Sequence, residues 1–124
     1  MSDFNIPASK YSPEINASAL TGIIRIEGSS YPENAYEFYT PVIDWIKTHL
    51  SSGSNSLTLD VQVDYFNTSS TKMLLDLLEL LAQFHQSDKD VAVNWYYEED
   101  DEDIREVGEE LSEDIDLPFN LIPY

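Results

Sequence analysis

The sequence predicts an α/β fold: a two-layer sandwich with a mixed, mostly parallel sheet of four to five strands and helices packed on one face. Strand-like and helix-like segments alternate three times along the chain, which is typical of parallel strands joined by right-handed crossovers. The strands also alternate between apolar and polar residues. A strand buried on both faces would be apolar throughout, so one face of the sheet is expected to meet water.

The chain has the size and composition of a single domain. Its 124 residues, of which 42% are hydrophobic, are enough to bury a core. We therefore interpret residues 1–124 as a single domain. Residues 1–18 contain two prolines among serine and asparagine, and we expect a loosely ordered arm there, with a short edge strand near residues 14–17.

The first strand is predicted over residues 20–27, where two isoleucines alternate with charged residues until Gly28 ends the segment. A helix then runs to about Leu50. Pro41 lies on its polar side, and a proline inside a helix costs roughly 3 kcal/mol because it removes a hydrogen bond. We expect either a kink or a new helix start at this point, with Thr40 as the cap.

The clearest strand pattern covers residues 57–66, with the odd positions from Leu57 to Tyr65 facing one side. A helix follows over about residues 70–86, and its apolar arc spans about 200°. This arc is wider than one contact with a sheet requires. Either a neighbouring helix covers the extra flank, or Leu75 or Leu78 stays partly open as a docking patch for a partner.

The last third of the chain repeats the alternation. Residues 91–97 alternate as a strand, and a third helix is expected to begin with Asp103 as its cap. The end, residues 117–124, is apolar and contains two prolines, which favours an edge strand or a segment packed over the core. The acidic run 98–103 lacks the glycine and the ligand spacing of a calcium-binding EF-hand loop, so we interpret it as a solvated loop.

The charge of the chain limits its partners. Six basic residues stand against 24 acidic ones, a net charge of −18. Nucleic acid is not an expected partner, because binding it requires clustered lysine and arginine. Basic protein surfaces are the natural counterparts, although the charge is equally explained by solubility alone.

Several classes of protein are also disfavoured. The chain has no cysteine, which excludes disulfides and thiolate catalysis, and it has no apolar run long enough for a membrane span. The N-terminal residues lack a signal-peptide pattern, so we expect a cytoplasmic protein. His49 and His85 fall near predicted helix C-termini, where capping or a surface position explains both. With four glycines and no phosphate-binding loop or nucleophile motif, we expect no enzyme activity, no cofactor and no metal.

The segment between the second strand and the second helix, residues 67–72, contains four hydroxyl side chains in a row. Such a hydroxyl either caps the helix by accepting a hydrogen bond from a free backbone N–H group or serves as a phosphate acceptor. A helix start suits the second role because its free N–H groups and positive dipole end attract an anion. The residues alone leave both roles open.

Five short motifs, taken in order, give the chain a resemblance over nearly its whole length to the SiaC-type bacterial regulatory phosphoproteins. The motifs are Ser30-Tyr31-Pro32-Glu33-Asn34, Asn67-Thr68-Ser69-Ser70, Trp95-x-Tyr97, Gly108-Glu109-Glu110 and Pro118-Phe119. These proteins are similar in fold to the STAS domains of anti-sigma-factor antagonists, which agrees with the alternation described above. Ordinary STAS antagonists carry an Asp-Ser-Ser/Thr-Gly-like site, whereas this chain has Asn-Thr-Ser-Ser without the glycine.

The resemblance implies a partner-switching regulator. A Ser/Thr protein kinase would phosphorylate Thr68, and a PP2C-type phosphatase would reverse the reaction. The unphosphorylated form would bind and activate a diguanylate cyclase, which links the protein to cyclic-di-GMP and biofilm control. Ser69 and Ser70 are then capping residues or secondary acceptors. The expected partner-binding residues are Asn67, Lys72, Leu75 and Leu78.

A different class of function remains as the alternative. The chain would then be an acidic binding or inhibitor protein that captures a basic protein surface independently of phosphorylation. Binding of this kind would weaken steeply with salt and would ignore Thr68, whereas neutralising the acidic run 98–103 would abolish it.

Overall fold

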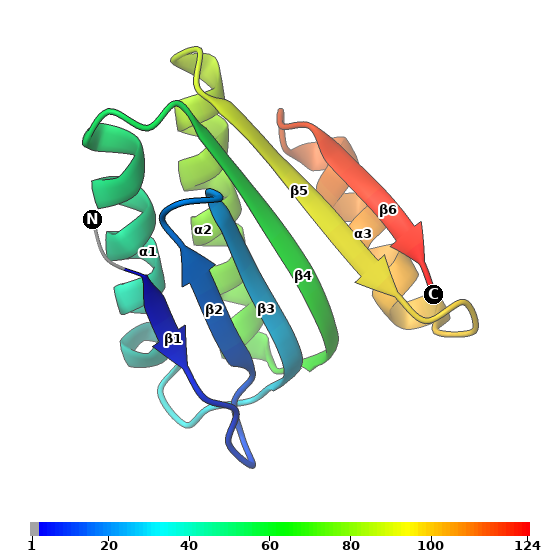
Figure 1. The fold of residues 1–124 in the computed structure, drawn as a ribbon. Coiled ribbons are helices and arrows are strands. Elements are labelled where there is room, and N and C mark those ends of the chain that lie inside the picture. Colours follow the sequence, from blue (N-terminus) through cyan, green and yellow to red (C-terminus); the bar gives the residue numbers. More distant parts are fainter. Residues whose placement is uncertain (1–2) are drawn as a thin grey trace.

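One six-stranded sheet carries three helices on one of its faces, as Figure 1 shows for the computed structural model, which describes residues 3–124. In chain order the elements are β1 (Phe4–Ile6), β2 (Glu14–Ser18), β3 (Ile23–Ser30), α1 (Ala35–Ser51), β4 (Ser56–Phe66), α2 (Thr68–Gln86), β5 (Asp90–Tyr97), α3 (Glu102–Asp114) and β6 (Phe119–Pro123). The strands lie side by side in sequence order. The β1–β2 and β2–β3 pairs are antiparallel, and the pairs from β3 to β6 are parallel. The predicted two-layer, mixed and mostly parallel architecture is confirmed, with six strands where four to five were expected.

The sixth strand comes from the N-terminal end of the chain. The short strand expected near residues 14–17 is β2, but it is not at the edge, because the segment before it, expected to be a loose arm, contributes β1. Ile15 and Ala17 of β2 are buried in the core, and β1 covers the outer edge of β2. The expectation for Met1 and Ser2 lies outside the described residues. At the other end β6 pairs with β5, so the C-terminal segment is an edge strand as predicted.

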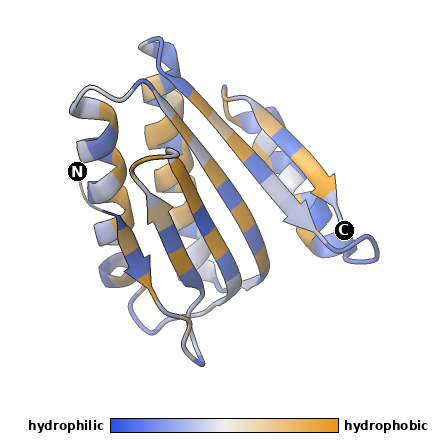
Figure 2. Ribbon diagram, viewed as in Figure 1, coloured by the Kyte–Doolittle hydropathy of each residue, from blue (hydrophilic) through white to orange (hydrophobic). Residues whose placement is uncertain are grey.

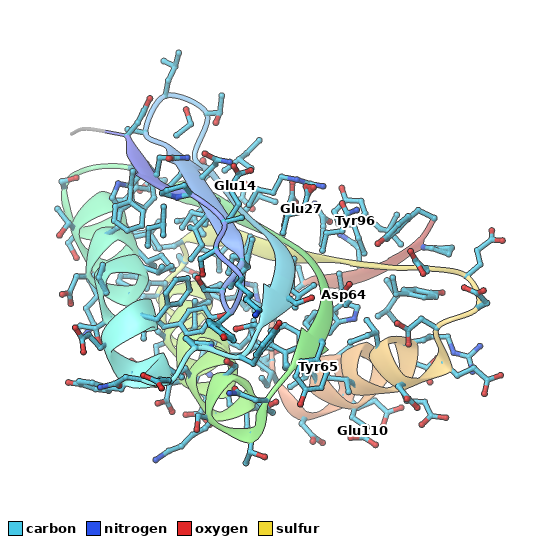
Figure 3. All side chains as sticks on the ribbon, turned by 90° about the horizontal axis from the view of Figure 1, so that it is seen from below. Glu14, Glu27, Asp64, Tyr65, Tyr96 and Glu110 are labelled. Carbon is cyan, nitrogen blue, oxygen red and sulfur yellow. The ribbon has the colours of Figure 1, made fainter. Side chains whose placement is uncertain are left out.

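The two faces of the sheet differ as the alternation predicted. Apolar residues of β3, β4 and β5 form the buried face under the helices, and polar residues alternate with them along each strand (Figure 2). Glu14, Glu27 and Tyr96 lie on the opposite face, away from the helices (Figure 3). On this face Arg25 forms an ion pair with Glu27 at 3.1 Å, and its guanidinium lies over the ring of Tyr96.

An irregularity in the β3–β4 pairing changes the end of both strands. Gly28 pairs with Val63, but the next residue, Ser29, pairs with Tyr65, so β4 contains one extra residue at this point. The extra residue reverses the alternation, because consecutive side chains of a strand point to opposite faces. Phe66 therefore stacks on the buried Trp95, with ring centroids 5.9 Å apart, while Tyr65 is 54% exposed.

Two predictions for these strands are therefore wrong. Tyr65 does not share the buried side of β4, and β3 does not end at Gly28 but continues to Ser30. Gly28 has a φ of 126°, a conformation that glycine adopts without steric cost and that keeps the strand paired beyond it. The start of β3 also differs, because Leu20 lies in the preceding turn with its side chain exposed.

Helix α1 continues through Pro41 without a new start. Asn34 caps it by accepting a hydrogen bond from the Glu37 amide at 3.0 Å. Thr40, expected as a possible cap, instead donates its hydroxyl to the carbonyl of the preceding turn. His49 is 2% exposed and stacks on Trp45 at 4.8 Å, so its predicted surface or capping position is wrong.

Helix α3 packs closely against β5 and β6 because of one glycine. A Cβ atom on Gly108 would lie 2.5 Å from the Cδ1 atom of Trp95, a distance that real Cβ atoms do not adopt. The Trp95 indole donates to the Ile104 carbonyl at 3.0 Å, which fixes the first turn of the helix. The cap is Asp101, whose carboxylate accepts from the Ile104 amide at 3.1 Å, and not Asp103 as predicted. None of the helices within residues 3–124 has the length and hydropathy that a membrane-spanning helix requires.

Candidate functional site

Helix α2 begins directly after β4, and Asn67 sets its first turn. The Asn67 side chain accepts a hydrogen bond from the Ser70 amide at 2.8 Å, which is the geometry of an N-cap. The Asn67 amide itself donates to the Ser30 carbonyl at 2.9 Å. The cap is therefore tied to the end of β3, and the expectation that Ser69 or Ser70 caps the helix is wrong.

The hydroxyl groups of the run have different environments. Thr68 and Ser69 are exposed. Ser70 is 0% exposed, and the Thr71 hydroxyl donates to the Asn67 carbonyl at 3.1 Å. The first two residues of α2 therefore present their hydroxyls to solvent, while the next two use theirs inside the protein.

Ser70 belongs to a buried network of three hydroxyl groups. The Ser30 hydroxyl lies 2.8 Å from that of Ser70 and 2.5 Å from that of Tyr39. Ser30 ends β3, Tyr39 lies on α1 and Ser70 lies in the first turn of α2. Burial raises the pKa of the Tyr39 phenol to about 12, against a smaller opposite effect of its hydrogen bond with Ser30. Because Ser70 lies two residues after Thr68, the network fixes the position of Thr68 at the surface.

The predicted partner-binding residues of α2 separate into exposed and buried ones. Lys72 is exposed and forms no ion pair within the described residues. Leu75 is 37% exposed, so no neighbouring helix covers it completely. Leu78 is 0% exposed, and its predicted place on a docking surface is wrong. It belongs to the core because α2 packs against both the sheet and α1.

The start of α2 carries no acidic side chain. The first turn of α1 contains Glu37, and that of α3 contains Glu102 and Asp103, whereas the first turn of α2 has none. Acidic groups stabilise a helix start through the dipole. Since Lys72 lies four residues after Thr68 on the same side of the helix, an anion on Thr68 meets both the dipole and a free ammonium group.

A groove opens beside this helix start, where β4 and β5 separate. Their pairing ends at Val61 and Trp95, although both strands continue, and Figure 1 shows the ends turning apart. The groove has a volume of about 350 Å³, and we call it the α2–α3 groove. It is lined by Asp64, Tyr65, Phe66, Thr71, Asp101, Asp103, Ile104 and Val107.

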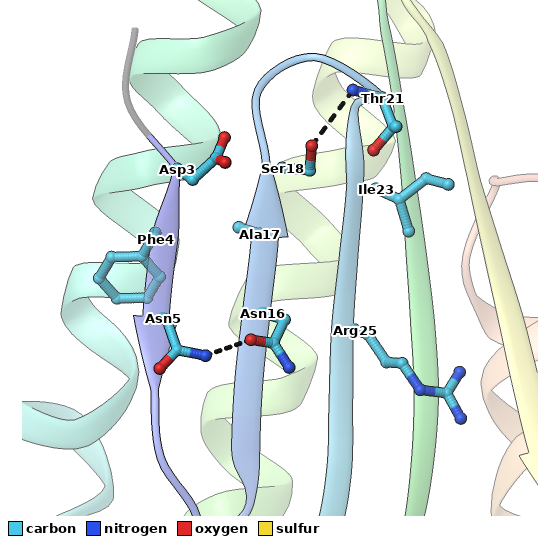
Figure 4. A pocket seen from close by; sticks show the side chains of 9 residues that line it. All are labelled: Asp3, Phe4, Asn5, Asn16, Ala17, Ser18, Thr21, Ile23 and Arg25. Atoms are coloured by element: carbon cyan, nitrogen blue, oxygen red, sulfur yellow. Dashed lines mark hydrogen bonds between the residues drawn. The ribbon is translucent and has the colours of Figure 1, made fainter.

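A second hollow lies far from the start of α2. It covers β1, β2 and the start of β3 and has a volume of about 460 Å³ (Figure 4). Thr21 and Ile23 line it at the beginning of β3, whereas Ser30 and α2 mark the other end of that strand. Within residues 3–124, no group of three or more His, Cys, Asp or Glu side chains is placed to hold a metal ion.

Comparison with known proteins defines the class of the chain. A family model described as SiaC family regulatory phosphoprotein matches residues 6–124. The chain is therefore a regulatory phosphoprotein by class. It belongs to the SiaC family, as the resemblance of its motifs predicted.

Solved structures of Pseudomonas aeruginosa SiaC share the fold. One of them is the crystal structure of the diguanylate cyclase SiaD in complex with its activator SiaC. That SiaC is 38% identical to this chain, with a TM-score of 0.94, and the match covers 98% of this chain and all of that one. Apo-SiaC is 39% identical with a TM-score of 0.91, over 98% of this chain and 99% of that one. An uncharacterized protein of Pseudomonas aeruginosa strain UCBPP-PA14 is 40% identical over 98% of this chain and 96% of its own length.

The residues that support the start of α2 from inside the protein were not predicted from the sequence. Ser30 and Tyr39 lie far from the hydroxyl run in the chain, and only the crossing of β3, α1 and α2 brings them to Ser70. The groove was missed for the same reason, because Asp64 and Asp101 come from separate elements. One signal was available: the Ser30 motif and the Asn67 motif both belong to the set that carries the resemblance.

Proposed function

We propose that this protein is a phosphorylation-controlled activator in which Thr68 is the phosphate acceptor. The unphosphorylated form binds and activates a diguanylate cyclase. A Ser/Thr protein kinase adds the phosphoryl group and a PP2C-type phosphatase removes it. The protein acts through its partners in cyclic-di-GMP signalling and catalyses no reaction of its own.

The observation that carries this proposal is the difference in exposure among the hydroxyl groups at the start of α2. Thr68 is the first residue of α2, it is exposed, and no hydrogen bond engages its hydroxyl among the described residues. Ser70 is excluded as an accessible acceptor by its complete burial. Ser69 is also exposed, and the resemblance assigns the acceptor role to Thr68.

The first turn of α2 accommodates a phosphoryl group without rearrangement. The group adds about −1.5 to −2 charges at neutral pH. Its interaction with a helix start contributes about 0.3–1 kcal/mol, and Lys72 is close enough along the helix to assist. Because the helix start is held by Asn67 and by the buried network, the fold stays the same.

The same group strongly opposes a partner packed on this surface. A partner that covers Thr68 and the half-exposed Leu75 has to bury the new charge, and an unpaired buried charge costs several kcal/mol. Each 1.4 kcal/mol weakens binding about tenfold. Phosphorylation thus controls binding and leaves folding intact.

The choice of partner is supported by the relative. SiaC was crystallised in complex with the diguanylate cyclase SiaD, and this chain matches that SiaC over 98% of its length. A cyclase partner is therefore proposed here by similarity. The exposed face of α2 is the surface on which the phosphorylation state of Thr68 is detected.

Phosphorylation by the cognate kinase tests the acceptor. The purified protein is incubated with that kinase and MgATP, and the product is analysed by intact-mass and fragment spectra. We expect a single phosphate on Thr68, its loss in Thr68→Val, and unchanged phosphorylation in the matched control Ser69→Ala. A phosphate located elsewhere, or none, contradicts the assignment.

A further inference from the structure

We propose that the α2–α3 groove is the recognition site for the kinase and that it receives an arginine side chain of that enzyme. This inference rests on the proposed function, because it requires Thr68 to be the residue that the kinase modifies. It adds what that function leaves open, namely how an enzyme recognises this threonine.

The groove lies within one helical turn of the acceptor. Thr71 lines it, and residues three positions apart on a helix are neighbours, with Cβ atoms roughly 5–6 Å apart. In the transfer, the Thr68 oxygen forms a bond to the γ-phosphorus of ATP, ADP leaves, and the hydroxyl proton passes to a base of the kinase. The kinase must therefore cover the surface around Thr68, and the mouth of the groove belongs to that surface.

The charges of the groove define the chemistry of its occupant. Asp64, Asp101 and Asp103 line it together, and none of them forms an ion pair among the described residues. The Asp101 carboxylate uses one oxygen to cap α3, and Asp64 accepts a hydrogen bond from the Ser29 hydroxyl. The remaining acceptor positions attract a cation and repel an acidic side chain.

The apolar part of the groove favours a long basic side chain over a small cation. Phe66, Ile104 and Val107 contribute apolar surface beside the carboxylates. Arginine and lysine bury a hydrocarbon stem along such a surface while the charged head reaches polar groups. A metal ion gains nothing from this lining, and the carboxylates are not arranged to hold one.

The exposed Tyr65 in the groove lining, which continues into a row of exposed tyrosines, favours arginine over lysine. The Tyr65 ring meets Tyr31 at 5.9 Å, and Tyr31 in turn meets Tyr11 at 5.5 Å. All three side chains are at least 36% exposed. A planar guanidinium stacks on aromatic rings and binds carboxylates through two parallel hydrogen bonds, which an ammonium group cannot do.

The test compares two double variants that lose the same charge. Asp101→Asn with Asp103→Asn removes two carboxylates from the groove and keeps the α3 cap, since asparagine caps as well as aspartate. Glu113→Gln with Asp114→Asn removes two exposed carboxylates from the far end of α3. Both variants are assayed as substrates of the cognate kinase with MgATP, and circular dichroism checks that both are folded.

We expect the groove variant to raise KM for the protein substrate roughly five- to tenfold, the loss expected for two partly exposed ion pairs. The value of kcat stays unchanged, because the groove binds the enzyme and takes no part in the transfer. The control variant keeps the wild-type KM. Added salt raises the wild-type KM more steeply than that of the groove variant.

Two results overturn the inference in distinguishable ways. If the kinase phosphorylates wild-type Thr68 but both double variants share its KM, the groove is not the recognition site and the proposed function stands. If wild-type Thr68 is not phosphorylated at all, the proposed function fails and this inference fails with it. A wild-type KM that is independent of salt also overturns the inference, and this measurement requires no variant.

Discussion

Ser30 and Ser70 lie 40 positions apart in the chain, and their hydroxyl oxygens are 2.8 Å apart in the interior of the protein. The contact joins the end of β3 to the first turn of α2, two residues after Thr68. The Tyr39 hydroxyl extends the network to α1. The start of α2 is thus fixed by buried hydrogen bonds, so that a modification of Thr68 alters the surface of the protein and not its fold.

The Tyr39 phenol makes stability depend on pH in alkaline solution. The unfolded chain ionises this group near pH 10, while the folded chain retains the proton until about pH 12. Folding therefore loses stability as pH rises through this window, by about 2–3 kcal/mol for a shift of this size. Urea denaturation of the wild type at pH 9 and above pH 11 measures this loss.

The Tyr39→Phe variant isolates the contribution of this phenol, because every other tyrosine is common to both proteins. At pH 9 the variant is expected to be less stable by about 1–2 kcal/mol, since a buried hydrogen bond is lost. The difference narrows as pH rises, and near pH 12 the order reverses, because phenylalanine does not ionise. Free energies of unfolding that fall in parallel with pH for both proteins contradict this role.

Removal of the α2 cap is expected to destabilise the folded protein. Asn67→Ala deprives the Ser70 amide of its acceptor and is expected to cost about 1 kcal/mol. Asn67→Ser retains an oxygen at the cap and should lose only a fraction of this. Hydrogen exchange of the first turn of α2 should accelerate in the alanine variant and stay near wild type in the serine variant. Equal exchange in both variants shows that the cap does not hold the turn.

Gly108→Ala tests the packing of α3. Alanine favours a helix more than glycine does by about 1 kcal/mol, but its methyl group would lie 2.5 Å from Trp95. We expect net destabilisation of about 1–3 kcal/mol from overpacking, together with a change in tryptophan fluorescence. The exposed control Glu110→Ala leaves both unchanged. A Gly108→Ala protein more stable than the wild type means that α3 does not require the close approach.

The acidic run distinguishes the proposed regulator from an acidic binding protein. Glu98, Glu99 and Asp100 are exposed and lie outside the lining of the α2–α3 groove. Replacing them with Gln, Gln and Asn should change affinity for the cyclase less than about threefold, as expected for exposed charges. Abolished binding in this variant, with no effect of Thr68→Glu, favours the acidic binding protein.

Local patterns were sufficient to predict the architecture. The alternation along β4 and the apolar face of α2 located both elements within one or two residues, because each is long and strongly periodic. The strand expected near residues 14–17 is β2, whereas β1 was not predicted, since its three residues are too few to show a periodic pattern. The inward turn of Phe66 was not predictable from periodicity, because the extra residue at Asp64 is defined only by pairing with β3.

The position of the candidate site along the chain was predicted, but the burial of its individual side chains was not. The order of residues locates the hydroxyl run at a helix start and names Leu75 and Leu78 as alternatives for an open position, and the resemblance selects Thr68. The burial of Ser70 and Leu78 does not, because it depends on how α1 and β3 cross beneath α2. Ser69 and Ser70 therefore had the same predicted role, whereas tertiary packing buries Ser70 and leaves Ser69 exposed.

The affinity of the diguanylate cyclase for the two forms of the protein shows whether phosphorylation of Thr68 controls docking. Unmodified protein and protein phosphorylated on Thr68 are titrated into the cyclase by calorimetry, and circular dichroism checks that both forms fold alike. We expect phosphorylation to weaken binding at least about a hundredfold, which corresponds to burial of an unpaired charge, with identical spectra. Equal affinities of the two folded forms would mean that a phosphate at the start of α2 does not control docking.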